Sequence, residues 1–147
     1  MSRKVRKEGY PSTRSELLGA LHTKQYDEGW LSQDGLKAVS DDLNVPAAAV
    51  KGVATFYHMY HNEPMGRNVI QICTNVACMI MGAESLVDLL KKEYGLEPGG
   101  TTDDKRFTLV IMECIGACGT APAMLVNDDF HENLDEKNII EILNGYK

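Results

Sequence analysis

The sequence has no apolar run approaching the roughly 20 residues that a membrane-spanning helix needs. No apolar stretch follows its basic start, Met1–Tyr10, so a secretory signal is not expected either. With a formal net charge of −6, the chain also lacks the basic surface of a general nucleic-acid binder. We therefore expect a soluble, intracellular protein whose few early basic residues form a solvated terminus: Arg3, Lys4, Arg6 and Lys7.

Familiar nucleotide-binding and catalytic motifs are missing as well. No Gly-x-Gly-x-x-Gly follows an expected strand, there is no P-loop, and no triad or carboxylate pair stands out. The histidines are scattered and none is near a cysteine in the sequence: His22, His58, His61 and His131. We expect no catalytic residues and no bond-breaking reaction by this chain alone.

The hydrophobic content of 44% indicates a chain that folds and buries a core. Pro64 and Gly66 interrupt the pattern near Asn62–Asn68 and divide the chain into residues 1–66 and residues 67–147. The first part is expected to be a small bundle of helices. The second part is expected to alternate strands and helices.

The helices of the first part are predicted from capping residues and apolar spacing. Thr13 and Glu16 fit a capping box for a helix that ends at Gly29. Ser32 fits the cap of a second helix, and Pro46 fits the first turn of a third. A further short helix is expected over 55–61.

The elements of the second part follow a different period. Strands are predicted over 69–72, 107–112 and 123–127, with a turn at 127–129 and a short fourth strand after it. Helices are predicted over 83–94 and 135–143. This order predicts an α/β sandwich of thioredoxin-like type, α+β in its mixture of elements, behind the helical bundle.

The chain has only four cysteines: Cys73, Cys78, Cys114 and Cys118. Structural disulfides are not expected in a reducing compartment, so metal binding or redox chemistry becomes their leading use. Each pair follows a predicted strand, which would bring four sulfurs to one edge of the sheet. Four thiolates fit a [2Fe–2S] cluster, since each iron takes two protein sulfurs.

Zinc is the main alternative, because sites made of four cysteines are common. Zinc pairs usually have two intervening residues, whereas four residues separate the first pair here and three the second. The Cys-x-x-Cys of a disulfide oxidoreductase is absent. The spacing therefore favours iron–sulfur over zinc and over free or disulfide cysteines, but leaves all three open.

The residues between the cysteines are small or apolar. They leave backbone N–H groups free to point at sulfur, an interaction that stabilises the negative charge of a cluster. Gly116 and Gly119 would let the backbone pass close to a cluster, although ordinary turn geometry explains both glycines equally well. A site of cysteines alone lacks the histidines of Rieske centres, so we expect a low potential, nearer to roughly −400 mV.

Long segments of the chain resemble a known family. "CTNVACMIMGAESLVDLLKKEYGL", "GGTTDDKRFTLVIMECIGACGTAPAMLVND" and "NLDEKNIIEIL" are similar to the thioredoxin-like [2Fe–2S] ferredoxin family. The upstream segment "LLGALHTKQYDEGWLSQDGLKAVSDDLNVPAAAVKGVATFYHMY" resembles the helical module of that family. The resemblance covers residues 14–147, and it is to the members that serve as the E-type subunit of bacterial NADH:quinone oxidoreductase (respiratory complex I).

The resemblance implies an electron-transfer subunit with one [2Fe–2S] cluster on Cys73, Cys78, Cys114 and Cys118. It implies an FMN-binding, NADH-oxidising partner (the F-type subunit of that complex) and a contact with the large iron–sulfur subunit (the G-type subunit). FMN and NADH would be bound by the partner. The complex would place the chain in the cytoplasm, peripheral on the inner face of the cytoplasmic membrane.

The resemblance leaves the assembly open, because the same module also occurs in NAD(P)-linked hydrogenases and formate dehydrogenases. These are the alternative assemblies. A redox-sensing DNA-binding regulator is a remote alternative, because residues 32–60 resemble a helix–turn–helix motif. However, the segment that would read DNA, residues 46–60, has only Lys51 as a cation for phosphate contacts.

Two residues differ from the family pattern, which usually has glycine where this chain has Lys105 and Glu132. Both lie away from the cysteines in the sequence, so we expect them to alter local turns and not the cluster.

Overall fold

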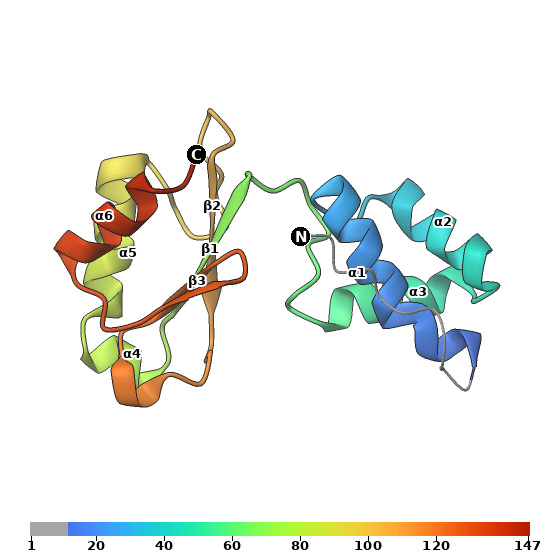
Figure 1. The fold of residues 1–147 in the computed structure, drawn as a ribbon, viewed down its shortest axis with the longest axis horizontal. Helices are drawn as coiled ribbons and strands as arrows, with labels where there is room; N and C mark the ends of the chain where they lie inside the picture. Colours follow the sequence, from blue (N-terminus) through green and yellow to red (C-terminus); the bar gives the residue numbers. More distant parts are fainter. Residues whose placement is uncertain (1–11) are drawn as a thin grey trace. The chain divides into compact units, whose positions relative to one another are not determined.

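The computed structural model describes residues 12–147, so the basic residues near the start lie outside the described part. The chain divides into two compact units, with the boundary between Pro64 and Met65 (Figure 1). The predicted boundary, after residue 66, lies two residues further along. That the two units are independent domains stays a prediction.

The first unit is helical, as predicted. A 3₁₀ helix η1 (Thr13–Glu16) leads into α1 (Leu17–Glu28), followed by α2 (Gln33–Leu43) and α3 (Ala47–Phe56). Ser32 caps α2 by accepting a hydrogen bond from the N–H of Gly35 at 2.9 Å. The helices and their connections enclose one apolar core: Leu17, Leu21, Leu31, Leu36, Val39, Val45, Val50, Ala54 and Tyr60.

Two predictions for the first unit are wrong. The expected Thr13–Glu16 capping box is replaced by η1, whose N-cap Ser12 makes no side-chain capping hydrogen bond. The expected helix over residues 55–61 stops at Phe56, because a distant side chain takes the backbone groups that follow. Gln25 of α1 donates to the carbonyl of Met59 and accepts from the N–H of His61, both at 2.7 Å. These bonds replace those of a continued helix.

The second unit is a four-stranded mixed sheet in the order β2-β1-β3-β4. Its first two strands are parallel, and the other pairs are antiparallel. The strand bounds are β1 Asn68–Cys73, β2 Phe107–Met112, β3 Met124–Val126 and β4 Asp129–His131. All four predicted strands are present, with that over residues 107–112 matched at both ends.

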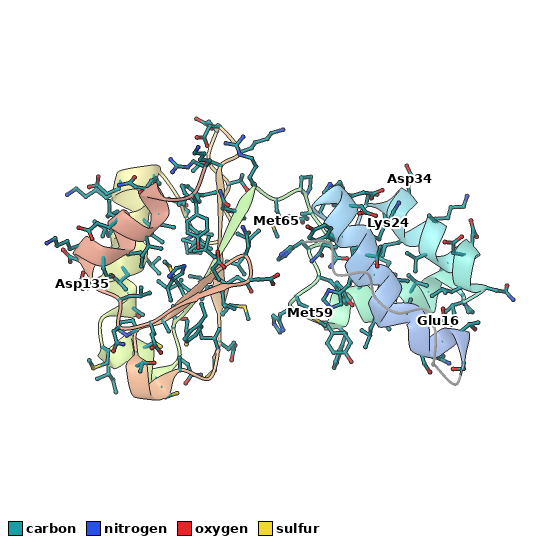
Figure 2. The ribbon with its side chains drawn as sticks, viewed as in Figure 1. Glu16, Lys24, Asp34, Met59, Met65 and Asp135 are labelled. Carbon is teal, nitrogen blue, oxygen red and sulfur yellow. The ribbon has the colours of Figure 1, made fainter. Side chains whose placement is uncertain are left out.

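Helices α5 (Ala83–Tyr94) and α6 (Glu136–Asn144) lie on the same face of this sheet (Figure 1). Asp135, labelled in Figure 2, caps α6 through a reciprocal capping box with Asn138. Between the helices and the sheet lies the second core: Ile70, Ile72, Leu86, Leu90, Leu96, Phe107, Leu109, Met124, Val126, Leu134, Ile139 and Leu143. The thioredoxin-like α+β arrangement is thus the one predicted.

The short helix α4 (Val76–Ile80), between β1 and α5, was not predicted. It is only five residues long, too short for a periodic pattern to show in the sequence. Asn75 starts it by accepting a hydrogen bond from the N–H of Val76 at 2.8 Å. None of the helices formed by residues 12–147 is long and apolar enough to cross a membrane.

Lys105 adopts a left-handed backbone conformation, with φ of 55°, in the turn before β2. The turn keeps its shape: the N–H of Lys105 donates to Thr102 at 2.8 Å, and its carbonyl accepts from Arg67 at 2.9 Å. A side chain raises the energy of this conformation by roughly 1–2 kcal/mol, from which the greater unfolded-state freedom of glycine subtracts about 0.5–1 kcal/mol.

We therefore expect Lys105→Gly to raise the free energy of unfolding by about 0.5–1 kcal/mol in urea denaturation. Lys105→Ala is the matched control, since it removes the same charge but keeps a Cβ, and it should give no such gain. A Lys105→Gly variant that is no more stable than Lys105→Ala would contradict this account of the turn.

Candidate metal centre

The parallel pairing of β1 and β2 brings the two cysteine-bearing loops to one edge of the sheet. Cys73 is the last residue of β1 and lies in register with Met112, the last residue of β2. Cys114 follows two residues later. Because parallel strands end at the same edge, residues far apart in the sequence meet there, as predicted.

Two short helices supply the other thiols. Cys78 lies within α4, and Cys118 begins the 3₁₀ helix η2 (Cys118–Thr120). Cys73 and Cys78 are each only 2% exposed and pack against Ala83, with Ile115 and Ala121 beside them. Cys114 and Cys118 are exposed. The site therefore has a buried side, lined by apolar groups, and a side open to solvent.

All four thiols are free, and they interact with one another. Burial raises the pKa of Cys73, but hydrogen bonds from the N–H of Asn75, the Cys78 thiol, the N–H of Ile115 and the Cys114 thiol together lower it below its ordinary value. A cysteine whose thiolate is favoured in this way is suited to bind metal.

The pKa shifts of Cys78 and Cys118 also show that the thiols lie close to one another. Burial raises the pKa of Cys78, and the hydrogen bond with Cys73 raises it further. The charge of Cys114 raises the pKa of Cys118. Four thiolates this close repel one another, so a bound cation is needed to hold them all deprotonated.

The donor set fits a [2Fe–2S] cluster. Each iron of such a cluster takes two protein sulfurs, and the four thiols at this edge of the sheet supply that number.

The sequence predicts that backbone N–H groups point at the cysteine sulfurs, and one such hydrogen bond is present at Gly116. The N–H of Gly116 donates to the sulfur of Cys114 at 3.4 Å, and Gly116 is left-handed, with φ of 83°. Gly119 has no positive φ, and no atom lies within 4 Å of where its Cβ would be. Turn geometry therefore explains Gly116 but not Gly119.

Glu132, which is remote from the cysteines in the sequence, contacts the 3₁₀ helix that Cys118 begins. The hydroxyl of Thr120, in the same 3₁₀ helix as Cys118, donates to the carboxylate of Glu132 at 2.7 Å. No pattern in the sequence signals this contact, because it depends on how the β4 end packs on η2. His131, beside Glu132, bonds instead to the hydroxyl of Tyr146 at 2.9 Å.

The family model of the thioredoxin-like [2Fe–2S] ferredoxins matches residues 4–147. The chain belongs to this family. As a thioredoxin-like [2Fe–2S] ferredoxin it carries one [2Fe–2S] cluster and transfers electrons.

Two relatives of this ferredoxin are named as E-type subunits of NADH-quinone oxidoreductase. The protein of Rhizobium meliloti that carries this name is 41% identical over 138 residues, which are 94% of this chain and 82% of the relative. Its counterpart in Salmonella typhimurium is 38% identical over 141 residues, which are 96% of this chain and 85% of the relative.

A solved structure shares the fold of the ferredoxin. The air-oxidised NAD⁺-reducing [NiFe]-hydrogenase matches 86% of this chain with a TM-score of 0.73 and 25% sequence identity. The match spans only 23% of that hydrogenase chain.

Proposed function

We propose that this ferredoxin is the electron-transfer subunit beside the NADH-oxidising subunit of an NADH:quinone oxidoreductase, with Cys73, Cys78, Cys114 and Cys118 as the iron ligands. The observation that carries the proposal is the similarity to the E-type subunits, which extends over 94–96% of this chain and 82–85% of theirs. All four thiols of the chain lie at one edge of the sheet, which supports the ligand assignment.

When bound, the cluster supplies one-electron chemistry with little change in geometry. The two pairs of cysteines would hold it from different sides. Cys73 and Cys78 anchor it on the side closed to water, and Cys114 and Cys118 hold it on the side that a partner can approach. The N–H of Gly116 offsets negative charge on the sulfur of Cys114.

The partner is an FMN-binding, NADH-oxidising subunit of the F type, with the large iron–sulfur subunit of the G type nearby. FMN takes two electrons from NADH as a hydride and must release them singly, so a neighbouring one-electron centre suits it. The chain then lies in the cytoplasm and meets the inner face of the membrane through the complex. Nucleic acid is not a partner, since α3 offers only Lys51 to a phosphate backbone.

A second assembly is favoured by one observation, the structural match to the NAD⁺-reducing hydrogenase. An equivalent subunit of an NAD(P)-linked hydrogenase or formate dehydrogenase would have the same cysteines and the same kind of partner. The two possibilities differ in the subunits that surround the NADH-oxidising module.

Affinity purification of the tagged full-length chain from its native cell extract, followed by mass spectrometry, tests the proposal. We expect a flavin-bearing NADH-oxidising subunit together with membrane subunits of the quinone reductase. Recovery of a hydrogenase or formate dehydrogenase subunit in their place would overturn the assignment to complex I. Recovery without any flavin-bearing subunit would overturn both assemblies.

A further inference from the structure

Glu132 is held against the turn that carries Cys118. Its carboxylate accepts a hydrogen bond of 2.7 Å from the hydroxyl of Thr120, and Thr120 ends the 3₁₀ helix that Cys118 begins. The side chain of Glu132 is exposed, so its pairing with Thr120 does not come from burial. The hydrogen bond instead holds the carboxylate at the end of the 3₁₀ helix that Cys118, a proposed iron ligand, begins.

The backbone on both sides keeps this pairing in place. The N–H of Asn133 donates to the carbonyl of Thr120 at 2.8 Å, and the N–H of Leu134 donates to that of Pro122 at 3.0 Å. These two bonds tie the segment after β4 to the segment after Cys118. Glu132 therefore keeps its position relative to the Cys118 turn when its side chain is altered.

No ion pair among the described residues includes Glu132. Residues 74–82 contain no charged side chain, and residues 113–123 contain only Glu113. The ion pairs formed within residues 12–147 join other side chains: Lys24 with Glu28, Lys91 with Glu97, and Lys92 with Glu93. No cation of the ligand loops opposes the field of Glu132 at the cysteines.

We propose that Glu132 is a tuning residue that lowers the reduction potential of the cluster. The inference rests on the proposed function in one respect, the assignment of Cys118 as a ligand. Reduction adds one electron, and a fixed negative charge nearby makes the more negative state less favourable. Glu132 acts through its field and through Thr120, and is not itself an iron ligand.

The test is a redox titration of the purified, cluster-loaded full-length chain, followed by visible absorption. Glu132→Gln removes the charge but keeps an oxygen that Thr120 can donate to. We expect it to favour the reduced state about threefold, a potential about 28 mV more positive for a one-electron couple. The shift should shrink in high salt, because an exposed charge is screened.

Two further variants separate the field from a general effect of charge or structure. Asp103→Asn removes one negative charge from the turn before β2, at the opposite end of that strand from Cys114, and should leave the potential unchanged. Thr120→Val releases the carboxylate and should raise the potential in part. Added to Glu132→Gln, it should raise the potential no further, since the two substitutions remove one interaction.

The inference is overturned if Glu132→Gln leaves the potential at the native value, or if Asp103→Asn moves it equally. Failure of the proposed function is distinguishable from these results. If the cysteines do not bind the cluster, the native chain itself shows no iron–sulfur spectrum. If the cysteines bind the cluster, the Glu132, Thr120 and Asp103 variants all retain the iron–sulfur spectrum. The measured potentials then decide whether Glu132 tunes the cluster.

Discussion

We expect Cys114→Ser to fold and yet to lose the visible absorption of the iron–sulfur cluster by at least about tenfold. Serine keeps the size and polarity of the side chain but removes the thiolate that iron prefers. Because Cys114 is exposed, the substitution leaves no buried polar group behind. Absorption spectra of chains reconstituted with iron and sulfide provide the measurement.

Cys78→Ser should lose the cluster to the same extent, with an additional loss of stability. Cys78 is 2% exposed and packs with Cys73 and Ala83, so a hydroxyl there is buried among apolar groups. The matched controls are Ala77→Ser and Ala117→Ser, which add a hydroxyl to each loop without removing a sulfur. If either cysteine variant kept the native spectrum, that cysteine would not be a ligand.

Removal of Met1–Pro64 should release the chain from its flavin-bearing partner while leaving the spectrum intact. Each unit has its own apolar core, and the four cysteines all belong to the second one. The reason for the release is that the helical unit contributes no ligand, so its role is expected to be in assembly. Co-purification with the truncated and full-length chains, each with the same tag, measures the effect.

Two outcomes would contradict this prediction in different ways. If the truncated chain still co-purified with the partner, the helical unit would not be what holds it. If the truncated chain failed to bind the cluster, the two units would not be independent domains. Circular dichroism of the truncated chain distinguishes a folded apoprotein from an unfolded one.

The sequence predicts those parts of the fold that local patterns determine. Residues 83–94 form a helix with the predicted ends, because an amphipathic pattern is closed by Gly95 in a left-handed conformation. Residues 107–112 likewise form the predicted strand. The gathering of the cysteines was predictable too, since it needs only two parallel strands, each followed by a cysteine.

What could not be predicted depends on contacts between distant residues. The helix expected over residues 55–61 stops early because Gln25, far away in the sequence, bonds to the backbone there. Glu132 is remote from the site in sequence, yet Thr120 brings it beside the Cys118 turn. Spacing and periodicity describe neighbours along the chain and carry no signal for such pairs.

The central claim, that the four thiols hold one [2Fe–2S] cluster, is tested most directly by metal analysis of the purified chain. Iron, acid-labile sulfide and zinc are measured per polypeptide, and the reduced protein is examined by electron paramagnetic resonance. We expect about two irons and about two sulfides per chain, with one unpaired electron after reduction. About one zinc per chain, with no sulfide and no resonance signal, would contradict the account.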